Sequence, residues 1–479
     1  MCILEQKKSM EEQAFAKYYI DPISLGAEDQ AAPMPHLYKQ MSVLRIQAEE
    51  GAYNLNRRTY TFINKNLDII TNPCEAYLYC RAQQSNTRNG NGVPLSNTIG
   101  IPSNAGIIHG FSWDINDTTI TSINDNLSST LYAVHSGVYA ASTTQLDHIG
   151  YTKHKGFLTE NLLKADGAIE IKIPLKSFVP ALKDNKTMWG VKTSLKIIFP
   201  NDFDDILYML DGTENPADMG FELTSVELRM PYIKLENQKQ LELWTQMYSN
   251  TINKYWLDVD QYFSQNINNN NNTENEIFRV AVKGLNSRPR WLLLHAVDTS
   301  IDARNDAKHK PMGFGGDGTR ASIAATDNTA NSIRFKKLRI KLNGIYIDGG
   351  DVKEFLNVNA SGTPDAAGAN TTQAWANHQG YMESYEEYCR FFGQYYDERS
   401  SVKSFNQWLA EQLYVFDLTN IDAESIFSNS GNALIVEVEF STFRGTSVVA
   451  STIKLIANIM YDKQLNITHS DNKATLTIS

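Results

Sequence analysis

Short runs of residues with a period of two recur along most of the chain, and this feature most constrains its fold. In the first half they lie at residues 41–48, 60–62, 78–80, 169–173, 189–199 and 226–230. In the second half they lie at residues 278–282, 338–342, 434–440 and 453–459, and a continuous apolar run lies at 291–294. Alternation sends successive side chains to opposite faces of a strand. Many short strands joined by turn-rich segments are typical of a sandwich or barrel, so we expect an all-β fold.

The length of the chain and one change of period divide it into domains. All-β domains often reach ~200–250 residues, so a chain of 479 residues suggests two. Near residue 236 the period of two gives way to Leu241, Trp244 and Tyr248, which are three and four residues apart and so share one helical face. The expected division is an N-terminal arm at 1–36, a first β domain at 37–235, a connector helix at 236–257 and a second β domain at 258–479.

The second half also contains two helical inserts and two long polar loops. Tyr385, Tyr388, Phe392 and Tyr395 form one apolar stripe, and residues 405–412 indicate a second helix. The loops are predicted at 302–331 and 357–379. Loops of this length are uncommon unless they are functional. The two halves share a pattern of strands, but we find no convincing repeat at the level of residues.

Charge and hydropathy exclude two classes of protein. The formal net charge is −10, and basic residues occur in short pairs such as Lys336-Lys337. Direct, sequence-specific nucleic-acid binding is therefore not expected, because it would need clustered cations to neutralise phosphates. No run approaches the ~20 apolar residues of a transmembrane helix, and the N-terminus lacks the apolar region of a signal peptide.

The four cysteines show no spacing typical of a metal site or a disulfide framework. Cys2, Cys74, Cys80 and Cys389 contain no Cys-x-x-Cys pair. Cys74 and Cys80 lie in an apolar, strand-like run, which favours buried, reduced thiols. We therefore expect synthesis in a reducing compartment, the cytosol.

Motifs for catalysis and for ligand binding are weak, so we predict no catalytic, cofactor or metal residues. The glycine-rich segment 313–318 lacks the Lys-Ser/Thr ending of a phosphate-binding loop. His148 and His154 are the nearest approach to a metal pair, but they have no zinc spacing. The acidic cluster at 202–205 is interpreted as a turn, with calcium binding left open. No Gly-x-Ser-x-Gly nucleophile motif is present.

Several strings in a fixed order resemble one known family. They are Ile173-Pro-Leu-Lys-Ser-Phe178, Trp189-Gly-Val-Lys-Thr-Ser-Leu-Lys-Ile197, Val226-Glu-Leu-Arg-Met-Pro-Tyr-Ile-Lys-Leu235, Arg288-Pro-Arg-Trp291, Leu342-Asn-Gly-Ile-Tyr346 and Val415-Phe-Asp-Leu418. Together they resemble the double jelly-roll major capsid proteins of Polinton-type elements and adintoviruses. More distantly, the chain looks like virophage and adenovirus hexon proteins.

The resemblance implies two tandem jelly-roll sandwiches and a structural, non-enzymatic role. It implies a homotrimer that forms a pseudo-hexagonal capsomer in the icosahedral capsid of a double-stranded DNA virus. The implied partners are neighbouring capsomers, penton proteins and minor capsid proteins, and the implied location is the virion. It leaves open whether a membrane lies beneath the shell. Trp189 and Trp291 are expected to be buried anchors, one in each sandwich.

Two other functions share parts of this pattern. A carbohydrate-binding or adhesion module would also have strands, aromatic residues and loops, but a secretion signal and paired cysteines would favour it, and both are missing. A glycoside-processing enzyme on a jelly-roll scaffold would need two carboxylates ~5–9.5 Å apart in a cleft, and no such pair stands out in the sequence.

Overall fold

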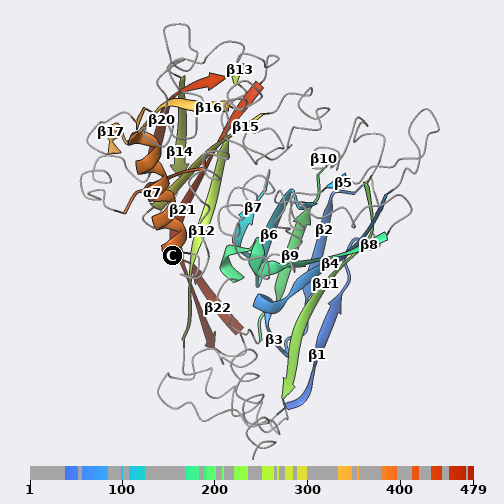
Figure 1. Cartoon of the computed structure of the whole chain (residues 1–479). Coiled ribbons are helices and arrows are strands. Elements are labelled where there is room, and N and C mark those ends of the chain that lie inside the picture. Colours follow the sequence, from blue (N-terminus) through green and yellow to red (C-terminus); the bar gives the residue numbers. More distant parts are fainter. Residues whose placement is uncertain are drawn as a thin grey trace, which may run out of the picture.

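The computed structural model of the chain contains two β-sandwiches side by side (Figure 1). It describes residues 38–51, 57–84, 99–100, 107–124, 168–182, 188, 190–200, 208–209, 221–235, 251–263, 267–268, 276–283, 289–298, 333–347, 353–354, 379–395, 413–419, 433–444, 452–470 and 473–478. The predicted arm, Trp189, the helix at 405–412 and the loops at 302–331 and 357–378 lie outside these residues.

The first sandwich consists of a five-stranded and a four-stranded antiparallel sheet. Sheet I pairs β1 (Tyr38–Ile46), β11 (Phe221–Leu235), β4 (Tyr77–Gln84) and β8 (Ala168–Pro174) in this order, with β3 (Ile70–Thr71) also on β11. Sheet II pairs β2 (Thr59–Asn64), β9 (Thr193–Ile198), β6 (Gly110–Ile115) and β7 (Thr118–Ile123). A small ribbon joins β5 (Ile99–Gly100) to β10 (Tyr208–Met209), and the described residues of this unit also form the 3₁₀ turns η2 (Pro73–Glu75), η4 (Leu175–Ser177) and η5 (Pro180–Leu182).

The second sandwich repeats this plan. Sheet III pairs β12 (Thr251–Phe263), β21 (Thr452–Ser470), β15 (Pro289–Asp298) and β19 (Tyr414–Asp417), and both β13 (Ile267–Asn268) and β22 (Lys473–Ile478) pair with β21. Sheet IV pairs β14 (Glu276–Lys283), β20 (Ala433–Arg444), β16 (Ile333–Leu342) and β17 (Ile345–Tyr346), with β18 (Lys353–Glu354) also on β16.

The strand order is the same in both sandwiches. In each, the eight principal strands in chain order give one sheet with the order first, eighth, third, sixth. The other sheet has the order second, seventh, fourth, fifth. This two-sheet, eight-stranded arrangement is the jelly roll. The predicted fold class, two tandem jelly-roll sandwiches, is confirmed.

An asparagine turn occupies the same place in both jelly rolls. Asn116 and Asn343 have positive φ angles of 46° and 48°, and each begins the two-residue turn between the fourth and fifth strands. Primed turns of this kind favour asparagine because it tolerates positive φ. The Asn116 Oδ1 atom accepts a hydrogen bond from the Lys192 N–H at 2.9 Å, and the Asn343 Oδ1 atom accepts one from the Ile435 N–H at 2.7 Å. Each asparagine thus ties the turn to the seventh strand or the residue just before it.

Burial explains why some strands alternate and others read as continuous apolar runs. In sheet IV, Phe278 is buried between the exposed Ile277 and Arg279, so one face of β14 meets solvent. In sheet III, by contrast, residues 291–295 and 455–460 are all buried. Strands covered on both faces lack a solvent-facing polar side and read as nearly continuous apolar runs, interrupted in these two ranges by His295 and Asn458. Sheet III is therefore a covered inner layer of the molecule.

In the part of the chain that the structure describes, helix α7 (Gln379–Tyr395) packs against the second jelly roll. It contacts β19 and β18. Tyr388 and Phe391 are buried, and the Phe391 ring meets the Trp291 ring edge-on at a centroid distance of 5.1 Å. The predicted helix around Tyr385 and Tyr388 is thereby confirmed, although the buried phenylalanine that the structure describes is Phe391, next to the Phe392 of the predicted stripe.

The predicted connector helix is wrong over its last seven residues. Residues 251–257 form the start of β12, which pairs with β21 along thirteen residues from Thr251 to Phe263. The ladder to β21 supplies backbone hydrogen bonds that a helix would otherwise supply locally, and tertiary pairing overrides the local pattern. Residues 236–250 lie outside the described part of the chain. The second jelly roll thus begins at or before Thr251.

Candidate functional site

The weak chemical motifs of the sequence fall outside the described residues. This holds for His148, His154, the acidic cluster at 202–205 and the glycine-rich segment at 313–318. Within the described ranges, no group of three or more His, Cys, Asp or Glu side chains could hold a metal ion. Among the same residues, no helix is both long enough and apolar enough to span a membrane.

The cysteines in the first jelly roll are structural. Cys74 and Cys80 are both buried and free, as predicted, and Cys389 on α7 is free and half-buried. Burial raises the pKa of the Cys80 thiol to about 12, because the low-dielectric interior disfavours the thiolate. A thiol held in the protonated form is a poor nucleophile and a poor metal ligand.

The most organised polar cluster lies where the two jelly rolls meet, and we call it the junction: Ile120, Thr121, Asp258 and Lys463. The Thr121 hydroxyl donates a hydrogen bond to Asp258 Oδ1 at 2.6 Å. Lys463 Nζ donates to Asp258 Oδ2 at 2.9 Å and to the Ile120 carbonyl oxygen at 2.7 Å. Ile120 and Thr121 belong to β7, whereas the two charged residues belong to β12 and β21. The junction therefore links the two sandwiches directly.

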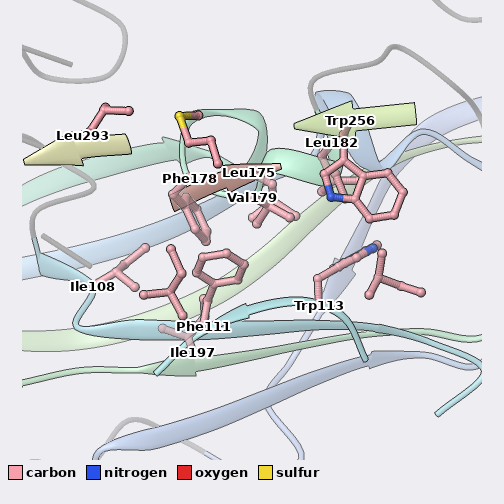
Figure 2. Close-up of a cluster of buried hydrophobic side chains, with 14 of the residues drawn as sticks. Ile108, Phe111, Trp113, Leu175, Phe178, Val179, Leu182, Ile197, Trp256 and Leu293 are labelled. Carbon is pink, nitrogen blue, oxygen red and sulfur yellow. The ribbon is translucent and has the colours of Figure 1, made fainter. Parts of the chain in front are cut away.

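An aromatic residue of the second jelly roll enters the core of the first. Trp256 on β12 is 7% exposed. β12 contacts both η5 and β7, and Figure 2 shows the Trp256 ring beside Leu182, on the same side of the cluster as Trp113. The Lys463 ammonium lies 5.8 Å from the centre of the Trp256 ring. The hydrophobic core is accordingly continuous from one sandwich to the other.

Asp260, a second carboxylate on β12, lies in surroundings that disfavour its ionised form. Asp260 follows Asp258 by two residues, so both point to the same face of β12. Burial, and then the negative charge of Asp258, raise the pKa of Asp260 above its ordinary value. The hydroxyls of Tyr461 and Tyr262 donate hydrogen bonds to Asp260 and partly offset this effect. Burial and the Asp260 charge in turn raise the pKa of Tyr262 to about 12.

These contacts fix the relative position of the two sandwiches. Asp258 is 3% exposed, so both its oxygens must find partners inside the protein. A buried ion pair of this kind adds little net stability, but breaking it leaves an uncompensated charge. Any shift of β12 against β7 would separate Asp258 from Thr121 and Lys463 from the Ile120 carbonyl. The junction therefore holds the two sandwiches in one relative position.

The junction was not predicted from the sequence. Charged residues in strands are ordinarily solvent-facing, and Asp258 and Lys463 lie 205 residues apart. One signal was present: Trp256, Asp258, Asp260 and Tyr262 alternate with a period of two and mix aromatic with acidic residues. That pattern indicates a strand face that is covered and yet polar.

Comparison with protein-family models and with curated proteins finds no match to this chain. Solved structures do resemble it. A chain in the cryo-EM structure of the Sputnik virophage aligns with a TM-score of 0.52 and 10% identity, covering 96% of this chain and 92% of that one. The mavirus major capsid protein aligns with a TM-score of 0.51 and 11% identity, covering 96% of each chain. At such identities the likeness shows the fold, the double jelly roll, over nearly the whole chain.

Proposed function

We propose that the chain is a major capsid protein of an icosahedral double-stranded DNA virus or virus-like element. The observation that carries the proposal is the extent of the structural likeness. The mavirus major capsid protein and this chain match over 96% of both lengths, so the likeness includes both jelly rolls and their arrangement. A single sandwich used as a binding module would account for one half of that match only.

The geometry supports a homotrimeric capsomer. Each subunit contributes two sandwiches of identical strand order, held in one position by the junction. Three such subunits around a threefold axis place six similar jelly rolls in a ring, which gives a pseudo-hexagonal outline. A head-to-tail interface that closes after three copies yields a finite particle and no filament.

The finer assignment is to the Polinton and adintovirus type. The strings that resemble this group lie on both jelly rolls, and both sets include the sixth strand, which is β8 in the first and β19 in the second. In the first, they cover the end of β8, strand β9 and strand β11; in the second, they cover the start of β15, the β16–β17 turn and strand β19. In this proposal the protein resides in the virion, its partners are neighbouring capsomers, penton and minor capsid proteins, and no residue is catalytic.

The test is the assembly state of the purified full chain. Light scattering should give about three times the mass of one chain, and negative-stain microscopy should show particles with a threefold or hexagonal outline. A stable monomer at high micromolar concentration under all salt conditions would count against the proposal. If such a monomer bound glycans, the carbohydrate-binding alternative would replace it.

A further inference from the structure

The outward face of sheet I carries an ordered grid of aromatic and charged side chains. Its members are Arg45 on β1, Glu222, Glu227 and Arg229 on β11, Tyr77, Tyr79 and Arg81 on β4, and Glu170 and Lys172 on β8. Between them, buried residues such as Leu78 and Ile171 point into the sandwich. In Figure 1, β6 and β7 of sheet II lie nearer to the second jelly roll than β1 and β11 do. We call this grid the sheet I face.

Contacts within the sheet I face hold its side chains in place. The Arg229 guanidinium lies 3.6 Å from the centre of the Tyr79 ring, and the Lys172 ammonium lies 4.4 Å from that of Tyr77. Arg229 also pairs with Glu227 at 3.3 Å. Side chains that are already ordered lose little conformational entropy when a partner docks. Tyrosine and arginine are also the residue types enriched in protein–protein interfaces and their hot spots.

One cation of the face, Arg45, has no ion-pair partner among the described residues. Arg45 stands directly opposite Arg229 in the β1–β11 ladder, and like charges in this position repel each other. Arg229 has Glu227 as its partner, whereas no hydrogen bond or ion pair joins Arg45 to another residue in the described part of the chain. Arg45 is exposed and therefore accessible to a partner.

The balance of charge indicates what the partner is. The sheet I face has four cations and three carboxylates, although the whole chain has a net charge of −10. Interleaved glutamates disfavour a nucleic-acid backbone, which requires an unbroken basic surface. The acidic remainder of an identical chain offers the carboxylates that a slightly basic, aromatic face attracts.

We propose that the sheet I face docks a second copy of this chain, with Arg45 pairing to a carboxylate of that copy. This inference rests on the proposed function and specifies one of its self-association surfaces. The outward face of sheet IV also places cations over a tyrosine, but the three cations whose side chains the structure describes there already have partners. Arg279 pairs with Glu437 at 2.7 Å, Lys341 pairs with Glu439, and Arg339 donates a hydrogen bond to the Tyr346 hydroxyl at 3.1 Å.

The test compares Arg45→Glu with Lys196→Glu in the full chain. Lys196 is an exposed strand residue on sheet II, so the control makes the same change of charge outside the sheet I face. Concentration-dependent light scattering and sedimentation should show self-association weakened by about tenfold or more in Arg45→Glu and changed less than about twofold in Lys196→Glu. Added salt should weaken the wild type more than Arg45→Glu, because the attraction is electrostatic. Thermal melting checks that both variants fold.

Each outcome decides the proposal. Wild-type oligomers that are insensitive to Arg45→Glu, or equally weakened by both variants, would overturn the docking surface and leave the capsid function standing. A wild type that stays monomeric under all conditions would overturn both. Loss of association confined to Arg45→Glu, with an unchanged melting temperature, would support the sheet I face as the docking surface.

Discussion

His295 is a fully buried histidine in the otherwise apolar run of β15. Burial lowers its pKa from the ordinary 6.5 to about 3, because the imidazolium would lose its hydration. His295 is therefore neutral in the folded protein at every pH near neutrality. In the unfolded chain the same residue has its ordinary pKa and takes up a proton in mild acid.

This difference predicts an acid sensitivity. Between the unfolded pKa and the folded pKa, the unfolded state binds a proton that the folded state does not. The contribution of neutral, buried His295 to the free energy of unfolding is fully present above about pH 6.5. It is lost as the pH falls, at about 1.4 kcal/mol per pH unit. From pH 6.5 to 5, His295→Gln should therefore lose about 2 kcal/mol less of its free energy of unfolding than the wild type. Denaturant melts measure this slope, and parallel pH profiles of the two proteins would contradict the prediction.

Trp291 is the second residue whose setting allows a quantitative expectation. It is fully buried in β15 and packs edge-on against Phe391 of α7. Trp291→Ala should lower the free energy of unfolding by about 3–5 kcal/mol through lost burial and a residual cavity. Tyr255→Ala, at a position that is 58% exposed, is the control and should change it by less than about 1 kcal/mol. An unchanged melting temperature for Trp291→Ala would refute the assignment of Trp291 as an anchor.

At this scale the sequence predicts apolar burial and misses polar burial. Trp291, Cys74 and Cys80 lie in apolar runs, and the structure buries all three. Asp258 and His295 are buried as well, but their neighbours in sequence do not reveal what covers them. Whether a polar side chain is buried depends on partners that are distant along the chain, and these are set by the fold as a whole.

At the scale of elements, strands were predictable and their partners were not. Period-two or continuous apolar runs marked eleven of the sixteen principal strands, since the pattern of a run is a local property. Pairing is not local: β1 lies beside β11, nearly two hundred residues away along the chain. The same limit explains the error at 251–257, where the ladder to β21 determines the structure. It also explains why the contacts of the junction between β7 and β12 were not predicted.

The junction yields a prediction about these paired elements. Asp258→Ala should lower the free energy of unfolding by about 2–3 kcal/mol, because it leaves the Lys463 ammonium unpaired. That is less than for a fully buried pair, since a fifth of the Lys463 side chain is exposed. The double variant Asp258→Ala, Lys463→Met should recover most of the loss, because no uncompensated charge remains. A double-mutant cycle by chemical denaturation tests this, and strictly additive losses would show that the ion pair does not couple β12 to β21.

For the whole molecule, the two jelly rolls share more than a strand pattern. The asparagine turns at Asn116 and Asn343 occupy equivalent positions and make the same side-chain bond to the backbone at the seventh strand. This repeat is not visible in the sequence, because asparagine is common in this chain and only the fold makes the two positions equivalent. In the proposed trimer, this repeated architecture with a shared core would allow three subunits to form a ring of six similar jelly rolls.

The N-terminal arm provides a prediction for the whole assembly. All eight principal strands of the first jelly roll begin at or after Tyr38, so removing residues 1–36 deletes none of them. Their mixture of charge, proline and a brief apolar stretch cannot bury much surface alone. The truncated protein should melt within a few degrees of the full chain and still form trimers, whereas closed shells should fail to form, because a neighbouring capsomer would have to supply the missing surface.

The decisive comparison sets this truncation against removal of residues 473–479. The second deletion takes away β22, which pairs with β21 over six residues and places Leu476 and Ile478 against the core. It should lower the melting temperature clearly, because it removes both a ladder of hydrogen bonds and buried apolar surface. Thermal melting and microscopy of co-expressed shell components give both readouts for each variant. If the loss of residues 1–36 prevents folding, the arm belongs to the first jelly roll and the domain boundary at residue 37 is wrong.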